Sequence, residues 1–459
     1  MHDFLSSARR APRRESSGPR VPTRRVRELL APTLLAAGLV ACGGEAHPPR
    51  PNVLLVTIDT LRADRCSVYG YEQRTTPRLE ELAAGGVLVE QAYAPMATTA
   101  PSHAAVLTGR FPLQLGLLQN GAELRAEELT LAERLRELGY RTAAFVSAFP
   151  VHSKFGFDQG FESYDEPTEN ERLAPDTLGR ATRWFDEWKS GSERPFFVWT
   201  HLFDPHSPYR PPAKHREKFL PEGATRQQRE AWLSAGYDGE IHFTDRSLGQ
   251  LFDHLRAIGA WENTLVIVTA DHGEGLGDHG EHQGHGLFVY EEAVRVPLLF
   301  HWPGRLPAGR RVAGPVSTVE IEPTLLALLG VPDETAAIGR DLGAALRGEA
   351  DLDPAHPIHT QRRSYLSEVV RDQEVKGFKF GLRVGSWKYI EALEEGTVEL
   401  YDLALDPHET VNVAADHPEA VESLGRHVRE WVQEHALGGG ESRLSEEDLE
   451  RLEALGYTR

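Results

Sequence analysis

Asn52-Val-Leu-Leu-Val-Thr-Ile-Asp59 is a mostly apolar run that ends on a carboxylate. A run of this length without polar alternation predicts a strand buried on both faces, as in a parallel sheet. Two similar runs, Phe196–Leu202 and Thr264–Ala270, follow later, and the second ends directly on Asp271. Because helical patterns lie between these strands, the sequence predicts a doubly wound, mostly parallel α/β sheet.

The rest of the chain shows two patterns. Up to about residue 345, strand patterns alternate with amphipathic helix patterns, and residues 210–228 are polar and rich in proline, as in a loop. After that point short strand patterns follow one another, which predicts a small antiparallel sheet with one helix. Further strands are expected at 86–93, 140–147, 296–302, 364–370, 379–384, 386–391 and 397–401, and helices at 76–84, 123–138, 176–189, 231–258, 321–329 and 417–435.

The stretch from Thr98 to Arg110 predicts a turn that leads into a short helix. Pro101 suits the first turn of a helix, where its missing N–H would have no partner anyway. Thr99 would then lie at a helix N-terminus, which favours an anion. A hydroxyl there can act as a nucleophile if a metal ion lowers its pKa. Taken alone, the stretch is equally compatible with a capped surface helix.

Two carboxylates follow two predicted parallel strands, Asp59 after the first and Asp271 after the later one. Ligands gather at this edge of such sheets. If the strands are neighbours, Asp59, Asp271, His272 and the Thr99 hydroxyl would surround one divalent cation. Mixed oxygen and nitrogen ligands suit Zn²⁺ or Mn²⁺ better than Ca²⁺, which prefers oxygen alone.

These motifs together resemble the sulfatase family, in the family's order, over residues 51 to 435. Thr99-x-Pro-Ser-His-x-x-x-Leu-Thr-Gly-Arg110 is similar to the sulfatase signature, which has at the position of Thr99 a cysteine that is oxidised to formylglycine. The stretches 52–59, 269–274 and 385–412 resemble other family motifs. The resemblance implies an alkaline-phosphatase-like fold and a Ca²⁺ or Mg²⁺ ion. Thr99 leaves no formylglycine, and Thr60 replaces a second family aspartate.

Three histidines are the candidate catalytic residues beside Thr99. His103 stands where sulfatases carry an arginine that supports the nucleophile, and His206 resembles a histidine that contacts the ester group. His285 stands where sulfatases place a lysine, so we expect it to act as general acid or to contact the developing oxyanion. His201 is a weaker candidate, and two loop histidines, His279 and His282, are equally compatible with solvated positions.

The predicted domain organisation follows from the resemblance. Residues 51–345 are expected to form a sulfatase-like catalytic domain and residues 346–436 a smaller C-terminal α+β subdomain. A glycine hinge and a terminal helix would occupy 437–459, and a linker 43–50.

Residues 1–42 resemble an export signal. Arg24, Arg25 and Arg27 precede a short apolar run at 29–40, which is too short to be a confident membrane span. The run ends in Leu39-Val-Ala-Cys42, similar to the lipobox of bacterial lipoproteins, so Cys42 would be lipidated. We expect an exported protein, periplasmic or anchored to a membrane; the alternative is an ordinary signal peptide with an incidental Cys42.

The charge balance argues against nucleic acid as a partner. The chain carries a formal net charge of −19, and its first 41 residues hold eight arginines against three acidic residues. The remainder has 42 Lys and Arg against 66 Asp and Glu, a net charge of −24. Binding to nucleic acid depends on cationic side chains that neutralise phosphates, which this acidic body does not favour.

The expected reaction is in-line attack of Thr99 on a sulfate or phosphate ester, with histidines protonating the leaving oxygen. A formylglycine hydrate releases sulfate by collapsing to the aldehyde, whereas a threonine ester must be attacked by water, so we favour phosphate esters. The substrate would be a sulfated or phosphorylated glycan, a lipid head group or a cell-wall polymer. Two alternatives are a transferase of the phosphoethanolamine type, which shares the Asp-His-Gly-Glu segment and a threonine nucleophile, and a non-catalytic lipoprotein that binds anionic glycans.

Overall fold

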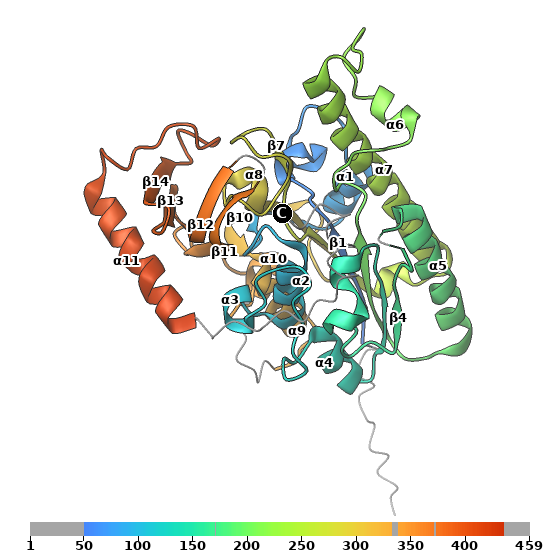
Figure 1. Cartoon of the computed structure of the whole chain (residues 1–459). Helices are drawn as coiled ribbons and strands as arrows, with labels where there is room; N and C mark the ends of the chain where they lie inside the picture. Colours follow the sequence, from blue (N-terminus) through green and yellow to red (C-terminus); the bar gives the residue numbers. More distant parts are fainter. Residues whose placement is uncertain (1–49, 170, 333–337, 371–372, 436–459) are drawn as a thin grey trace, which may run out of the picture. The chain divides into compact units, whose positions relative to one another are not determined.

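The computed structural model describes residues 50–169, 171–332, 338–370 and 373–435 (Figure 1). The predicted export signal with Cys42, the hinge and the terminal helix lie outside the described residues. Within those ranges, every helix is too short or too polar to span a bilayer. The predicted domain boundaries at 345 and 436 stay predictions.

The larger sheet has eight strands in the order β10-β2-β9-β6-β1-β5-β3-β4. Seven of them run parallel, and β9 alone is antiparallel to both of its neighbours, β2 and β6. This arrangement confirms the predicted mostly parallel α/β fold. The strands are β1 (Asn52–Ile58), β2 (Val87–Tyr93), β3 (Arg141–Phe145), β4 (Ser163–Asp165), β5 (Phe196–Leu202), β6 (Thr264–Ala270), β9 (Arg295–His301) and β10 (Arg310–Ser317).

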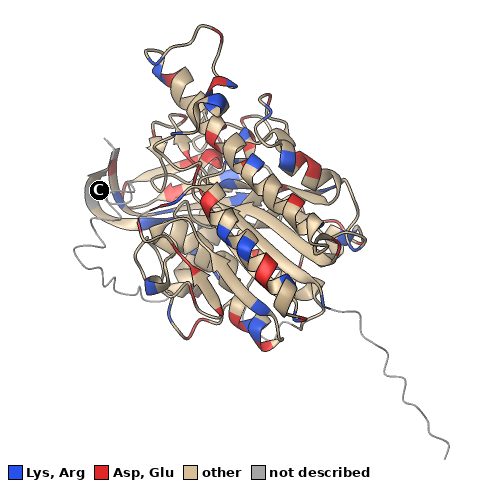
Figure 2. Cartoon of the chain, turned by 90° about the vertical axis from the view of Figure 1, so that its right-hand side faces the viewer, with Lys and Arg blue, Asp and Glu red and all other residues tan. Residues whose placement is uncertain are grey.

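Helices cover both faces of this sheet. On one face α1 (Pro77–Ala84), α5 (Ala174–Gly191) and α7 (Arg229–Ala257) pack together, and Figure 2 shows charged residues of both signs along the helices on this side. The other face carries α2 (Thr99–Thr108), α4 (Leu131–Glu137), α9 (Ile321–Leu328) and α10 (Gly343–Arg347). Connections contain the short helices α3 (Pro112–Leu115), α6 (Ala213–Glu217) and α8 (Glu291–Val294).

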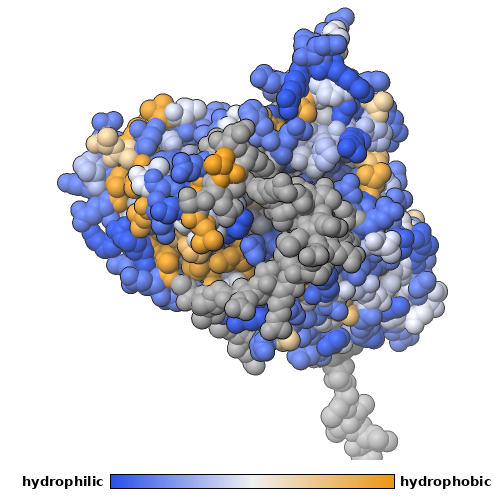
Figure 3. Space-filling model, viewed as in Figure 1, coloured by the Kyte–Doolittle hydropathy of each residue, from blue (hydrophilic) through white to orange (hydrophobic). Residues whose placement is uncertain are grey.

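The predicted small sheet is antiparallel, in the order β11-β12-β13-β14. Its strands are β11 (Ile358–Val370), β12 (Gln373–Val384), β13 (Trp387–Ala392) and β14 (Thr397–Asp402). The helix α11 (Pro418–His435) packs on it through a core that includes Leu382, Leu400 and Val428. Figure 3 shows apolar side chains over this part of the molecule. Both the sheet and its helix confirm the predicted C-terminal architecture.

Two local predictions were wrong, and some strands were not predicted. The helix expected at 123–138 begins only at Leu131, because the Thr130 hydroxyl accepts from the Glu133 N–H at 3.2 Å while the Glu133 carboxylate accepts from the Thr130 N–H at 2.9 Å. Upstream of this cap, Glu128 is buried and pairs with Arg110. The loop at 210–228 contains α6, and neither β10 nor the hairpin of β7 (Gly275–Leu276) and β8 (His282–Gly284) was predicted.

Candidate active site

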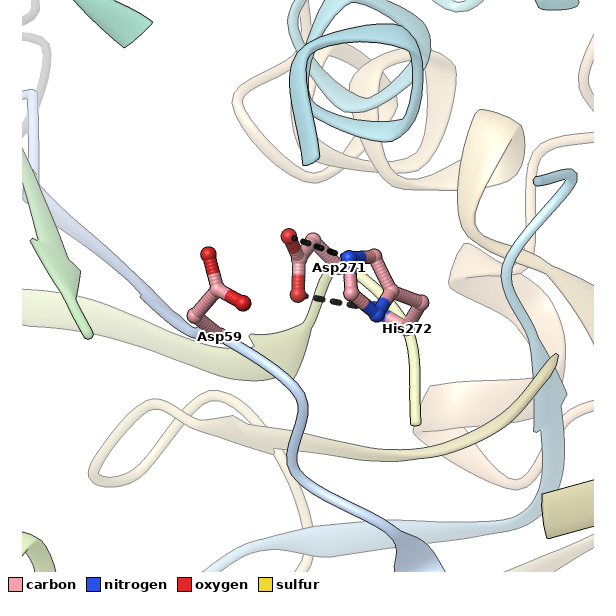
Figure 4. A group of neighbouring side chains, drawn as sticks. All are labelled: Asp59, Asp271 and His272. Carbon is pink, nitrogen blue, oxygen red and sulfur yellow. Dashed lines mark hydrogen bonds and ion pairs between the residues drawn. The ribbon is translucent and has the colours of Figure 1, made fainter. Parts of the chain in front are cut away.

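Two buried carboxylates meet at the carboxyl edge of the larger sheet. β1 and β6 are neighbours, with Ile58 opposite Ala270, so the residues that follow them, Asp59 and Asp271, lie side by side (Figure 4). His272 completes the group: one ligand atom from each of the three residues lies within 4.8 Å of the other two. All three side chains are fully buried. The predicted convergence of Asp59, Asp271 and His272 is therefore present.

This group fits a divalent cation. The His272 Nδ1–H donates to the carbonyl of Gly273 at 2.9 Å, so its Nε2 presents a lone pair. Burial lowers the pKa of His272 to about 3 and raises the pKa values of both aspartates, which for Asp271 is reinforced by the charge of Asp59. Asp59 Oδ1 and Asp271 Oδ2 make no hydrogen bond with any described residue. A cation would satisfy both oxygens and offset two adjacent negative charges.

Thr99 lies at this group, as the first residue of α2. Its hydroxyl donates a hydrogen bond to Asp59 and lies 3.4 Å from the Nε2 of His272. The side chain is completely buried, and the helix N-terminus adds a positive partial charge. The structure thus brings Thr99, the candidate nucleophile and fourth candidate ligand, together with the other three candidate metal ligands.

His103 supports this arrangement from the next turn of α2. Its Nδ1–H donates to the carbonyl of Thr99 at 2.8 Å, and its Nε2 accepts from the Thr57 hydroxyl at 2.9 Å. Thr57 in turn accepts from the indole N–H of Trp199 at 3.0 Å. Burial lowers the pKa of His103 well below its usual value, so the ring is neutral. Because both ring nitrogens are engaged within the protein, His103 is placed to position Thr99.

His206 and His285 form a pair whose Nε2 atoms are 3.3 Å apart. Each Nδ1–H donates to a backbone carbonyl, that of Ser207 at 2.6 Å for His206 and that of Ala97 at 2.9 Å for His285. The two Nε2 atoms can therefore hydrogen-bond to each other only when one of them carries a proton. The ring of His285 lies 4.1 Å from the ring of His272, between centroids, so the pair lies against the Thr99 group.

His201 belongs to the site, although the sequence ranked it lower. Its Nδ1 accepts from the Ser147 N–H at 3.3 Å, which places the ring proton on Nε2. That Nε2–H donates to Asp59 Oδ2 at 3.3 Å, and burial lowers the pKa of His201 to about 3, so the ring is neutral. In the sequence, the sign that His201 has a role in the site was a histidine inside a mostly apolar strand.

The other two loop histidines lie apart from this group. The Nδ1 of His279 lies 2.5 Å from a Glu292 carboxylate oxygen, and its ring stacks on Tyr290 at 3.8 Å between centroids. His282 is exposed. His279 therefore ties the β7–β8 hairpin to α8, and no contact of either residue with Thr99 is present among the described residues.

Thr60 has an unusual backbone beside Asp59. Its φ is +53°, in the left-handed region that β-branched residues rarely adopt, at a cost of about 1–3 kcal/mol. Its N–H donates to Asp271 Oδ1 at 3.2 Å, and its carbonyl accepts from the Tyr237 hydroxyl at 2.5 Å. These bonds hold the strained residue against the second aspartate.

A cavity of about 780 Å³ lies between the start of α7 and the β7–β8 hairpin. Arg65, Arg229, His282 and Gln283 contribute to its wall. The carbonyl of Gln283 accepts from the hydroxyl of Ser207, at 3.1 Å, in the loop that carries His206. The cavity therefore adjoins the segments that carry the histidine pair.

The match to known protein families agrees with this geometry. The Sulfatase family model matches residues 51–331, and the model described as N-sulphoglucosamine sulphohydrolase, C-terminal, matches residues 277–435. The chain belongs to the sulfatase family. It is therefore a hydrolase of the class that acts on sulfuric or phosphoric esters, and its family is metal-dependent.

Individual relatives agree with this assignment. The chain is 26% identical to the ulvan-active sulfatase of Formosa agariphila over 345 residues, covering 67% of this chain and 68% of that protein. It is 28% identical to arylsulfatase A of Homo sapiens over 469 aligned positions, covering 86% and 90%. The crystal structure of the phosphonate monoester hydrolase of Agrobacterium radiobacter shares the fold, with a TM-score of 0.70 at 22% identity, covering 84% of this chain and 96% of that one.

Proposed function

We propose that this sulfatase-family hydrolase cleaves phosphate mono- or diesters with Thr99 as the nucleophile. The observation that carries the proposal is the position of the Thr99 hydroxyl, hydrogen-bonded to Asp59 and 3.4 Å from the Nε2 of His272. Threonine occupies the position at which the sulfatase signature has its cysteine, so no formylglycine can form there.

The chain's own residues supply the attacking group and its surroundings. Asp59, Asp271 and His272 would hold one divalent cation, which lowers the pKa of a bound hydroxyl and offsets the negative charge of an ester. His103 fixes the first turn of α2 through the carbonyl of Thr99, at 2.8 Å, and so orients the nucleophile. His201 orients Asp59 through its Nε2–H.

The histidine pair is the proposed source of the proton for the leaving group. With both Nδ1–H groups donated to backbone carbonyls, the two Nε2 atoms of His206 and His285 are placed to hold one additional proton between them. A proton held between two imidazoles near the Thr99 group can pass to the leaving oxygen, and the neutral pair can later accept one from water.

The second step of the reaction, hydrolysis of the covalent threonine ester, favours phosphate esters over sulfate esters as substrates. When the Thr99 oxygen bonds to the phosphorus or sulfur atom, the bond to the leaving oxygen breaks and that oxygen takes the proton of the histidine pair. The resulting threonine ester cannot release its acid by collapsing to an aldehyde. Water must then attack the phosphorus or sulfur atom directly. Hydrolysis of a phosphothreonine at a metal site is the easier of the two reactions, so phosphate esters are preferred over sulfate esters.

The remainder of the substrate and its location complete the proposal. The cavity of about 780 Å³ beside the loops of the histidine pair is large enough for a sugar or a head group, and two relatives are named ulvan-active sulfatase and N-acetylglucosamine-6-O-sulfatase. We expect an anionic glycan, a lipid head group or a cell-wall polymer outside the cytoplasm. Lipidation of Cys42 would anchor the enzyme to a membrane near such a substrate.

The direct test is turnover of an aryl phosphate, a bis-aryl phosphodiester and an aryl sulfate, each with Zn²⁺, Mn²⁺ or Ca²⁺. We expect phosphoester turnover that falls by about 10³-fold or more in Thr99→Ala. The matched variant Thr99→Ser, which keeps a hydroxyl, should retain part of it. Sulfate turnover by the wild type would overturn the preference for phosphate, and full activity in Thr99→Ala would refute the nucleophile. No turnover of any substrate would favour a transferase or a binding protein.

A further inference from the structure

The loop that carries His206 fixes the position of this histidine. We call residues 203–210 the His206 loop; it begins directly after β5 and leads toward α6. The ring of Phe203 stacks on the ring of His206 at 4.3 Å between centroids, and the His206 N–H donates to the carbonyl of Phe203 at 2.9 Å. The position of the His206 ring therefore depends on where the backbone of this loop lies.

Two buried carboxyl groups hold the backbone at the two ends of the His206 loop. Near its start, Asp204 Oδ2 accepts from the Ala174 N–H at 2.7 Å, at the N-terminus of α5. At its end, the Arg210 N–H donates to Glu240 Oε1 at 2.5 Å, within α7. Asp204 and Glu240 are only 8% and 4% exposed. Each end of the loop is thus bonded to a different long helix.

The helix α7 has two glycines where the end of the loop crosses it. A Cβ atom on Gly239 would lie 2.8 Å from Pro211 Cγ, and one on Gly236 would lie 3.1 Å from the Cβ of Tyr209. The backbone can approach the helix this closely because both residues lack a side chain. Glu240 directly follows Gly239, so its carboxyl adds a hydrogen bond to this close contact.

We propose that Glu240 is a positioning residue for the reaction: by holding the end of the His206 loop, it keeps His206 paired with His285 and within reach of the leaving oxygen. Asp204 has the same part at the start of the loop. The inference rests on the proposed function for the role of the histidine pair as the proton source, and it adds the residues that hold one member of that pair in place.

Glu240 holds the loop as an uncharged acid. Burial and the charge of Asp204 raise the pKa of Glu240 to about 9; the charge of Glu171 adds to this shift, and the charge of Arg216 opposes it. A neutral carboxyl group accepts a hydrogen bond through its carbonyl oxygen, as a side-chain amide does. Glutamine should therefore replace Glu240, whereas a side chain of similar length without an acceptor should not.

The first measurement is hydrogen exchange of the His206 loop in the purified full chain, followed by mass spectrometry. Glu240→Met keeps the length of the side chain and removes the acceptor, so we expect the loop amides to exchange about tenfold faster or more than in the wild type. Glu240→Gln should exchange within about threefold of the wild type. Equal exchange in Glu240→Met and the wild type would overturn the inference.

The second measurement compares turnover of two phosphate esters that differ in the leaving group. The leaving oxygen of phenyl phosphate needs a proton, whereas dinitrophenyl phosphate releases a stable anion and needs little help. Glu240→Met should lower kcat for phenyl phosphate by about tenfold or more, and for dinitrophenyl phosphate by less than about threefold. An equal loss on both esters would mean general damage to the site and would overturn the inference.

The matched control is Glu240→Gln, which should keep the wild-type ratio of the two rates. If Glu240→Met does not fold, Asp204→Ala removes the acceptor at the other end of the loop and takes its place with the same expected results. Failure of the proposed function has a different signature. The wild type would then turn over neither ester, which would overturn the role in the reaction, whereas faster exchange in Glu240→Met would still show that Glu240 holds the loop.

Discussion

His201 offers a test in which one side chain makes two separable hydrogen bonds. Its Nδ1 accepts from the Ser147 N–H and its Nε2–H donates to Asp59, each at 3.3 Å. Asparagine places an oxygen near the position of Nδ1, so His201→Asn keeps the first bond and loses the second. Glutamine places an N–H near the position of Nε2, so His201→Gln does the reverse. Both variants lose the contact of the ring with His103, at 4.8 Å between centroids.

The two variants should lose different properties: His201→Asn should lose metal affinity, and His201→Gln should lose stability. Loss of a group that orients a metal ligand typically weakens metal affinity by about 10- to 100-fold, or about 1.4 to 2.8 kcal/mol, and this is expected for His201→Asn. His201→Gln leaves the buried Ser147 N–H without a partner, which costs about 1–3 kcal/mol of the free energy of unfolding. Its metal affinity should stay within a few-fold of the wild type.

Metal affinity is measured by chelator competition, and the free energy of unfolding by urea titration of the metal-free protein. The loss of ring packing is common to both variants and cancels when they are compared with each other. Equal metal affinity in His201→Asn and His201→Gln would show that His201 does not orient Asp59 and would refute the reasoning.

Two further predictions concern stability. Burial lowers the pKa of His279, but the Glu292 hydrogen bond and charge more than offset this and raise it to about 9. Protonated His279 therefore stabilises the fold fully below its usual value of about 6.5, and this contribution is lost as the pH rises through 9. In urea titrations, the difference in the free energy of unfolding between wild type and His279→Gln should be larger at pH 6 than at pH 10; a constant difference would contradict this. Thr130→Ala, which removes the cap of α4, should cost about 1 kcal/mol at neutral pH, whereas Thr130→Ser should cost little.

The strands that are buried on both faces were the ones predicted most accurately from the sequence. β1, β5 and β6 begin and end at the predicted residues because each is a continuous apolar run. The start of α4 was misplaced because Glu128 is buried by its pair with Arg110, which lies 18 residues earlier and leaves no trace in the local pattern. β10 was missed because it contains Gly314 and Pro315, which suit an edge strand better than a central one.

Site residues that directly follow the end of a predicted strand could be identified from the sequence. Site residues whose role depends on which strands are neighbours in the sheet could not. Asp59 and Asp271 could be proposed as a pair from their positions alone. The role of His201 depends on β5 lying beside β1, with Thr57 opposite His201, and chain order does not state this register. The strained backbone of Thr60 likewise has no counterpart in sequence pattern.

The reversed direction of β9 has a consequence for how this enzyme can change. Because β6 and β9 are antiparallel neighbours, the segment from Asp271 to Val294 leaves and rejoins the sheet at one edge, where adjacent strands lie about 4.8 Å apart. Closing such a segment depends only weakly on its length, at about 0.6 kcal/mol for each doubling. Within this segment, His285 belongs to the histidine pair, and Val289 and Val294 are buried in the core, so these residues have to be kept. The β7–β8 hairpin can change in length while the strand order stays the same, and evolution or protein engineering can reshape the wall of the neighbouring cavity by this route.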